Sequence, residues 1–216
     1  MSMIKALRTL AAIENGTLNA AALQTQVAGS QARKDEISQL LAVRSLYARI
    51  ANSRNAMDAL AGSAAAWGEI MTHRYLSLFL AECVESINAK MAIYNSDTAL
   101  NSIKASAAAM AVMRAASRFS IVSTAANNTS SVSLGIIAGT ANILLGVSHA
   151  ETTTRNYTIA TLRSGSAISA TINTNANNNT LAKDYDVAVP ITSVYSFVSV
   201  AGNTSTSYFG VLRCDV

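Results

Sequence analysis

Residues that could catalyse hydrolysis or bind a metal ion are few in this sequence. The chain has only two histidines among its 216 residues. One of them, His149, lies two positions before Glu151, so an extended backbone would place both side chains on the same side. Asp184 and Asp186 have the same spacing and could lie nearby in the fold. A metal or acid–base site needs a third ligand at a recognisable spacing, and because the sequence offers none, we expect no metal site.

The remaining reactive side chains are isolated from one another. Cys83 and Cys214 show neither CxxC spacing nor a neighbouring His cluster, so we predict no zinc site and no disulfide framework, and we expect Cys83 to be buried on the apolar face of its helix. His73 lies beside Arg74 at the start of a predicted helix, where a solvated or capping role is more common than catalysis. No Gly-x-Ser-x-Gly elbow, phosphate loop or GxGxxG occurs. The sequence therefore predicts a protein that is not an enzyme and needs no cofactor.

Three tyrosines in the second half of the chain could bind sugars, namely Tyr157, Tyr185 and Tyr208. Planar rings stack on pyranose faces, and the Asn amides of the same region could donate hydrogen bonds to sugar hydroxyls. Aromatic residues are also enriched in strands, where they pack in or beside the core, and that role is the more common one. Surface recognition and strand packing both stay open for these residues.

Composition limits the partners of the protein. The net charge of +4 comes from 16 basic and 12 acidic side chains, and the basic ones are scattered along the N-terminal half, so we expect no nucleic-acid partner. A membrane span needs about 20 apolar residues. The best candidate, Leu134 to Val147, is too short and contains Gly, Thr and Asn, so we expect no stable membrane span. The apolar stretch Leu10–Ile13 is likewise too short for an export signal, and Glu14 interrupts it.

The first half of the chain contains an internal repeat. Residues 50–70 return 43 positions later as residues 93–113, and each copy contains a ten-residue unit, Ser-x-x-Ala-Φ-x-x-Φ, where Φ is large and apolar. The offsets of three, four and seven residues share one face of a helix, and the Ser at the start could cap free backbone N–H groups. Fixed periods of this kind are typical of stacked or elongated assemblies, because each unit buries its apolar face only against a neighbour.

Two helical geometries fit the repeat. A continuous helix would carry a wide, drifting apolar stripe, because ten residues leave each unit rotated from the last. Alternatively the chain breaks at Ser53 and Ser63, with Gly62 ending one short helix and Ser63 capping the next. We also expect Thr17 and Ser30 to cap helices nearer the N-terminus.

The apolar positions of the repeat are predicted to form an oligomer interface. Small Ala side chains allow close helix approach but bury little area, so association with other chains would supply the missing burial, and we expect a homo-oligomer with a trimer favoured. The predicted interface residues are Met57, Leu60, Trp67, Ile70, Leu100, Ile103, Met110 and Met113.

Composition divides the chain into residues 1–118 and 119–216. The first part is rich in Ala and charged residues and carries helical apolar stripes throughout, so it is predicted to be a helical bundle or coiled coil. In the second part Ser, Thr and Asn account for 38 of 98 residues, with four basic and four acidic side chains. About eight short segments there, separated by turn signals, are predicted to be strands, several of them alternating with period two. They are Phe119 to Val122, Val132 to Ile137, Ile143 to Val147, Asn156 to Arg163, Ala167 to Ile172, Tyr185 to Ile191, Val194 to Val200 and Ser207 to Arg213.

The predicted fold class is therefore α+β with segregated halves. Eight short strands in the second part favour an antiparallel β-sandwich or jelly roll, although a β-prism or an intertwined trimeric head would have the same pattern. Strands this poor in charge have little protection against edge pairing, so loops or neighbouring chains are expected to cover their edges.

The units Ile50–Met57 and Leu60–Trp67 resemble the A-N-S-x-x-A-M-x-x-[VIL] repeats of structural proteins from tailed bacteriophages, particularly tail fibre and appendage proteins. The likeness covers 50–71 and 93–113, about a fifth of the chain. It implies a helical N-terminal part for attachment and oligomerisation and a β domain at the far end, often in homotrimers. Trp67 and Met110 stand where the family often has Met, and no catalytic residue carries over.

The sequence thus predicts a non-enzymatic virion protein, such as a short tail fibre, collar, whisker or baseplate component, assembled in the host cytoplasm. Its partners would be further copies of the chain, other virion proteins and possibly a host-surface glycan or protein. One alternative is a secreted membrane-active or pore-forming protein with a receptor-binding β domain. Another is a glycan-active enzyme using Asp184, Asp186 or Glu151, which the missing carboxylate constellation disfavours.

Overall fold

The computed structural model of the protein describes residues 3–125, 131–133, 140–149, 155–160, 167–172, 189–191, 196–199 and 206–216. The chain divides into two compact units, Met1–Ser117 and Arg118–Val216. Helices make up the first unit and strands the second, so the protein is α+β with its two kinds of element segregated along the chain. The boundary expected after residue 118 lies one residue from this division.

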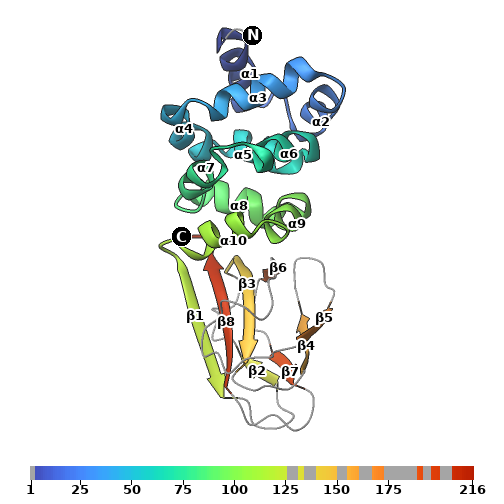
Figure 1. The fold of residues 1–216 in the computed structure, drawn as a ribbon, viewed down its shortest axis with the longest axis vertical. Coiled ribbons are helices and arrows are strands. Elements are labelled where there is room, and N and C mark those ends of the chain that lie inside the picture. Colours follow the sequence, from blue (N-terminus) through green and yellow to red (C-terminus); the bar gives the residue numbers. More distant parts are fainter. Residues whose placement is uncertain are drawn as a thin grey trace. The chain divides into compact units, whose positions relative to one another are not determined.

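The helical unit consists of ten short α-helices and one 3-10 turn (Figure 1). They are α1 (Met3–Glu14), α2 (Ala20–Ala28), α3 (Gln31–Leu41), η1 (Arg44–Leu46), α4 (Tyr47–Asn52), α5 (Arg54–Gly62), α6 (Ala64–Thr72), α7 (Leu76–Cys83), α8 (Ile87–Asn95), α9 (Asp97–Lys104) and α10 (Ala107–Arg114). The longest, α1, has 12 residues, which is less than the several heptads that a coiled coil needs. The unit is therefore a stack of short helices, and the coiled-coil alternative is excluded.

Serine residues at helix starts separate the helices of the repeat. Ser53 and Ser63 have extended backbones, and their Oγ atoms accept hydrogen bonds from the backbone N–H groups of Ala56 and Ala66. Each of these bonds satisfies one of the free N–H groups at a helix start. The same cap is formed by the serines that begin α8, α9 and α10, which are Ser86, Ser96 and Ser106. Of the two geometries open from the sequence, the structure has the short capped helices.

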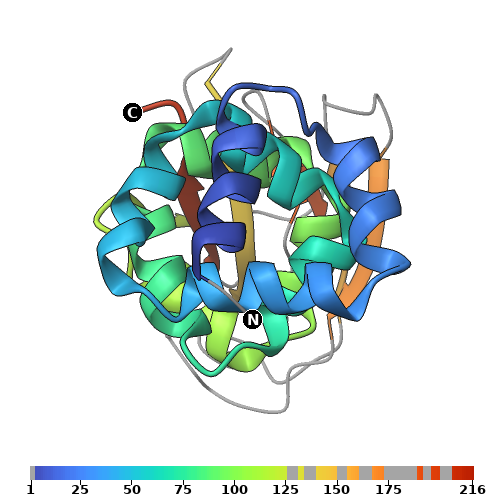
Figure 2. The ribbon, with the colours of Figure 1, turned by 90° about the horizontal axis from the view of Figure 1, so that it is seen from above.

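The helices form a superhelix with three helices in each turn, and each turn packs on the next. The helix α2 packs on α5, which packs on α8, while α3 packs on α6 and α6 on α9. The third column contains α4, α7 and α10. The helices α3, α6 and α9 begin at residues 31, 64 and 97, so one turn takes 33 residues. Figure 2 looks down the stack and shows helices of successive turns lying over one another.

This 33-residue turn explains the 43-residue repeat of the sequence. A shift of 43 positions is one turn plus one ten-residue unit, so it aligns α5 with α9 and α6 with α10 rather than with the helices directly below them. Because α5, α6, α9 and α10 are all built from the same Ser-capped unit, this shift produces a match. The 43-residue period of the sequence therefore differs from the 33-residue period of the superhelix.

Hydrogen bonds from capping residues join one turn to the next. Besides capping its own helix, Ser86 donates from Oγ to the carbonyl of Ala51 near the end of α4, at 2.7 Å. The hydroxyl of Ser96 likewise donates to the carbonyl of Ala61 in α5. Asparagines two residues after a capping Ser add similar bonds, with Asn88 Nδ2 donating to the carbonyl of Asn52 at 2.7 Å. These bonds satisfy carbonyl groups that a helix end leaves without an intrahelical partner.

Gly62 ends α5, as expected, but it does so without a left-handed backbone. It is the last residue of α5, its backbone is not left-handed, and Ser63 both ends α5 and begins α6. A Cβ atom at position 62 would lie 2.9 Å from the Cβ of Ala20 on α2, which is closer than real Cβ contacts come. Glycine is therefore required here by the close packing of α2 on α5 rather than by backbone conformation.

The cap of α2 also differs from the prediction. Asn19, not Thr17, caps this helix, and its side chain accepts from the N–H of Ala22 at 3.0 Å. The backbone between α1 and α2 turns at Gly16, which has a φ of 78°. Thr17 instead donates its backbone N–H to Asn15 Oδ1 at 2.9 Å, so it belongs to the turn. The expected cap at Ser30 is present, with Oγ accepting from the N–H of Arg33.

The second unit contains two antiparallel sheets in the part of it that the structure describes. The strands are β1 (Phe119–Ala125), β2 (Ser131–Ser133), β3 (Asn142–His149), β4 (Arg155–Ala160), β5 (Ala167–Ile172), β6 (Val189–Ile191), β7 (Ser196–Ser199) and β8 (Thr206–Arg213). One sheet has the order β1-β8-β3-β6 and the other β2-β7-β4-β5. Each strand overlaps a segment that was predicted to be a strand. Pro190 lies on β6, an edge strand of the described sheet, which is where strands tolerate proline.

Candidate functional site

The eight apolar residues predicted to form an oligomer interface are all in the core of the helical unit. Their side chains are 0–3% exposed within a single chain. They are Met57, Leu60, Trp67, Ile70, Leu100, Ile103, Met110 and Met113. We expected other copies of the chain to bury these residues, but the stacked turns of the same chain bury them. These side chains therefore offer no exposed area to a partner.

His73 has a structural environment. It follows the last residue of α6, and its Nδ1 accepts a hydrogen bond from the backbone N–H of Tyr75 at 3.2 Å. A further hydrogen bond joins the ring to the backbone of Ser38. Burial, with a smaller contribution from Arg74, lowers the pKa of His73 below its ordinary value, although the bond to Ser38 opposes this. The imidazole therefore acts as a neutral link between the end of α6 and α3.

Neither cysteine is poised for chemistry. Cys83 is fully buried in α7, and burial, together with the nearby Glu82, raises the pKa of its thiol far above the ordinary value. A thiol must be ionised to act as a nucleophile, so this residue is inert. Cys214 is also buried, and its Sγ donates to the carbonyl of Leu212 at 3.6 Å.

The candidate residues of the second unit are only partly placed. His149 is the last residue of β3, where it pairs with Ser207 on β8. Its predicted neighbours Glu151, Asp184 and Asp186 lie outside the described residues.

Of the three tyrosines considered for sugar binding, the structure places two, and they lie in different strands. Tyr157 lies in β4 and pairs with Ala170 on β5, whereas Tyr208 lies in β8, which belongs to the other sheet. Tyr185 lies outside the described residues. Two of the three thus fall within strands, and these strands belong to separate sheets.

A polar network that the sequence did not predict joins α1 to α3. Arg33 donates from Nη1 to Glu36 Oε2 at 2.6 Å and to Thr9 Oγ1 at 2.9 Å. The Thr9 hydroxyl in turn donates to Glu36 Oε2 at 2.7 Å. Thr9 and Glu36 are each 5% exposed, while the Arg33 side chain is 40% exposed. The buried carboxylate is therefore compensated by its neighbours, which burial of a charge requires.

This network forms one wall of a groove of about 550 Å³ between the first three helices. The polar and charged residues that line the groove are Lys5, Arg8, Thr9, Thr17, Gln26, Arg33 and Glu36. Three of these side chains are cationic, and the single carboxylate, Glu36, is already bound to Arg33 and Thr9. The groove therefore presents net positive charge to solvent.

The outer face of α1 borders the groove and is apolar. Met3, Ile4 and Leu7 are 36%, 61% and 37% exposed, whereas Ala6 and Leu10, which lie beside Met3 and Leu7 on the helix, are fully buried. Figure 2 shows α1 in front of the other helices, at the end of the stack. Ile4 lies outside the buried stripe of Ala6 and Leu10, and an apolar residue there, next to Lys5, is the signal by which the sequence could have indicated this surface.

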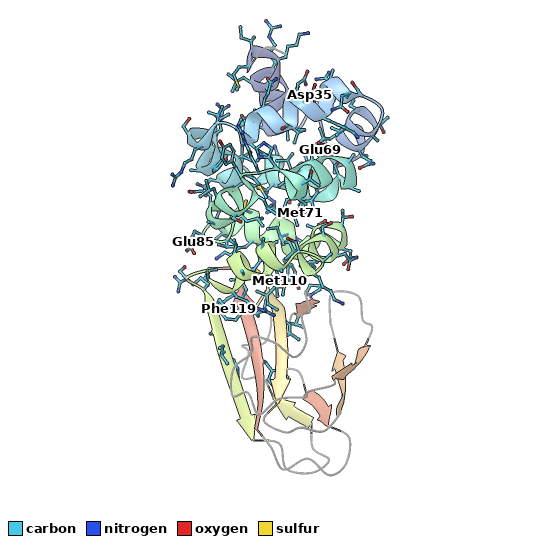
Figure 3. All side chains as sticks on the ribbon, in the orientation of Figure 1. Asp35, Glu69, Met71, Glu85, Met110 and Phe119 are labelled. Atoms are coloured by element: carbon cyan, nitrogen blue, oxygen red, sulfur yellow. The ribbon has the colours of Figure 1, made fainter. Side chains whose placement is uncertain are left out.

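A second hollow, of about 390 Å³, lies where α3 meets the end of α6. It contains Glu69, labelled in Figure 3, whose carboxylate lies 3.7 Å from Lys34 Nζ on α3. Gln39 contributes a buried Oε1 atom that has no hydrogen-bond partner. His73 also lines this hollow, but both of its ring contacts are structural.

The described residues form hollows that are lined by polar and charged side chains. Among them, no three His, Cys, Asp or Glu side chains lie close enough to hold a metal ion. In that same part of the chain, none of the helices has the length and hydropathy needed to cross a bilayer. The most distinctive site is the positively charged groove with its apolar border on α1.

Comparisons with known proteins do not identify a family. No family model matches the chain, and no curated protein matches it significantly. The function is accordingly inferred from the residues and their geometry.

Proposed function

We propose that the protein is a non-enzymatic structural component of a tailed-phage virion, such as a short tail fibre, collar, whisker or baseplate protein. In this proposal the helical unit attaches the protein to the particle, and the strand unit forms a head that packs against other virion proteins or recognises a host surface. The protein would be located in the virion and would act as a homo-oligomer, with a trimer favoured.

The observation that carries the proposal is the construction of the helical unit. Its repeated, Ser-capped helices form a stack with a continuous internal core, and stacks of this kind present extended surfaces for binding other proteins. Its buried ionisable groups are compensated or inert, as Glu36 and Cys83 illustrate. A protein-binding scaffold uses these features, whereas an enzyme would need a cluster of reactive side chains.

The finer architecture of the head is also a proposal. Two antiparallel sheets of four strands each are what a β-sandwich or jelly roll requires, and their strands carry few charges. We therefore propose that the two sheets pack face to face. Because the repeat is buried within each chain, the proposed oligomer would use the head or the ends of the helical stack instead.

Particles produced by cells that carry the coding sequence test this function. They would be purified on a density gradient, their proteins identified by mass spectrometry, and the protein located with gold-labelled antibodies against the helical unit. We expect the chain in stoichiometric amounts, with label on the tail, collar or baseplate. Its absence from purified particles, together with its presence in the free lysate, would contradict the proposal. A capsid protein from the same gradient fraction is the positive control.

A further inference from the structure

The N-terminal end of the helical stack has the features of a docking surface. We propose that the outer face of α1 and the adjoining groove bind an acidic amphipathic segment of a partner protein. The surface consists of the apolar side chains Met3, Ile4 and Leu7 and the cationic side chains Lys5 and Arg8, with Arg33 on the far wall of the groove.

The apolar part of this surface is unusual for the end of a stack. Each inner helix of a stacked-repeat protein is covered by its neighbours, and the terminal helix normally carries a polar outer face to keep the protein soluble. In α1, buried Leu10 faces the stack, yet Ile4 on the outside is 61% exposed and Leu7 37%. The described residues thus leave apolar side chains uncovered at this end of the stack.

The charge of the surface identifies the chemistry of a covering element. Among the described residues, Lys5 and Arg8 form no ion pair, and both line the groove. The carboxylates of the same region are occupied, since Glu36 accepts from Arg33 and Glu14 is paired with Arg49. Cations without counterions next to an apolar strip complement a segment that carries both carboxylates and apolar residues.

The third acidic residue of the region does not alter this balance. Asp35, labelled on α3 in Figure 3, accepts a hydrogen bond from Gln31 Nε2 at 2.9 Å. Because Glu36, Glu14 and Asp35 each already accept a hydrogen bond from a neighbouring side chain, a partner has to bring its own negative charge.

Other occupants match this surface less well. A second copy of the chain would bring another α1, and Lys5 and Arg8 of the two copies would repel each other. A nucleic acid would satisfy the cations through its phosphates but would leave Met3, Ile4 and Leu7 exposed to water. An acidic amphipathic helix is complementary to both parts, in the manner of helix-in-groove recognition. This inference does not rest on the virion proposal, so the two fail separately.

Fluorescence anisotropy with a defined probe tests the inference on the full-length chain. The probe is a labelled helical peptide with Leu along one face and Glu elsewhere, and its controls are a scrambled peptide of the same composition and a Leu/Lys counterpart. We expect saturable binding of the acidic amphipathic peptide alone. The double variant Lys5→Glu/Arg8→Glu should weaken binding by about tenfold or more, and Ile4→Ser/Leu7→Ser by a similar factor, because one removes the charge and the other the apolar contact.

Matched variants distinguish the surface from general effects. Arg44→Glu reverses an exposed cation elsewhere in the unit, and Leu78→Ser replaces an exposed apolar residue of α7, so both should bind the probe like the unaltered chain. All variants would first be shown to retain the helical signal of the parent by circular dichroism.

Four results would overturn the inference. They are no binding of the acidic peptide, equal binding of the scrambled or Leu/Lys peptide, equal loss in the Arg44 or Leu78 control, and a concentration-dependent dimer that Ile4→Ser/Leu7→Ser abolishes. Sedimentation with vesicles of phosphatidylcholine and phosphatidylglycerol adds a further check. Vesicle binding that Lys5→Glu/Arg8→Glu abolishes, without binding of the peptide, would assign the surface to an anionic lipid headgroup instead.

Discussion

The contacts within the helical unit and those within the strand unit join residues at different separations along the chain. In the helical unit the main contacts of each helix are with its own turn and with the adjacent turns, about 33 residues away. In the first sheet of the other unit, β1 pairs with β8, so residues 119–125 meet residues 206–212. Stability in the helical unit is thus a sum over neighbours, whereas the sheet forms only when the two ends of its sequence come together.

The largest effect should follow from a change in the middle of this sheet. Phe209 is fully buried in β8, which pairs with both β1 and β3. Phe209→Ala should cost about 3–5 kcal/mol and release all three strands together. Hydrogen exchange read by mass spectrometry measures this as a simultaneous loss of protection in β1, β3 and β8. Loss confined to β8 would show that the sheet is no more cooperative than the helical stack.

A change of similar size in the helical unit should have a local effect. Trp67 is fully buried in α6, and Trp67→Ala should cost about 3–5 kcal/mol, with exchange rising in α6 and in its neighbours α3 and α9 before the rest. The indole Nε1 is buried without a hydrogen-bond partner, so Trp67→Phe should cost about 1.5 kcal/mol or less. Chemical denaturation compares the two, and equal losses would show that the Nε1 group does have a partner.

A pair of glycine substitutions should change stability in opposite directions. Gly62→Ala forces a methyl group against Ala20, and this overpacking should cost about 1–3 kcal/mol, which exceeds the helix propensity gained. Gly68→Ala, in α6, meets nothing within 4 Å and should stabilise the unit by about 0.5–1 kcal/mol. Thermal unfolding followed by circular dichroism measures both. If Gly62→Ala were stabilising, the close approach of α2 and α5 would be wrong.

Substitutions at two capping serines distinguish the stability contributed by a helix cap from that contributed by a hydrogen bond between turns. Ser53→Ala removes only a helix cap, at a cost of about 1 kcal/mol. Ser96→Ala removes a cap and also the hydrogen bond to the carbonyl of Ala61, so it should cost about 1 kcal/mol more. Urea denaturation of the two variants gives the difference directly. Equal costs would mean that the bond between turns contributes nothing net.

The smallest effect concerns pH. Because the folded protein lowers the pKa of His73 below 6.5, the unfolded chain binds a proton just below that pH that the folded chain does not. The contribution of His73 to stability is therefore present above that window and is lost as pH falls through it. His73→Gln should make the free energy of unfolding less dependent on pH between about pH 7 and pH 5. Identical pH profiles would exclude this role for His73.

The elements that the sequence predicted well depend on local signals. The first helices of the repeat show this, because their key residues lie close together in sequence. The spacing alone predicts that Ser63 caps α6 and that Ala66 and Trp67 are buried in the core. The strands likewise follow from alternation over a few residues, as in Ala167–Ile172, which the structure reproduces residue for residue.

The features that the sequence could not predict depend on contacts between distant residues. The network of Thr9, Arg33 and Glu36 joins positions 24 and 27 residues apart, and no local pattern indicates it. Nor does the repeat reveal that its partner is the next turn of the same chain, because burial against a second copy would leave the same pattern. Lys90 was also beyond prediction from the sequence. It occupies an apolar (Φ) position of the unit that begins at Ser86, and although it is a charged residue it is only 1% exposed.

The most direct test of the account is hydrogen exchange in α5, α6, α9 and α10 on the full-length chain at low and at high concentration. The account predicts equal protection of these helices at both concentrations, because their apolar residues are buried by the same chain. Protection that disappears on dilution, while the strands stay protected, would contradict it and would assign the repeat to an interface between copies.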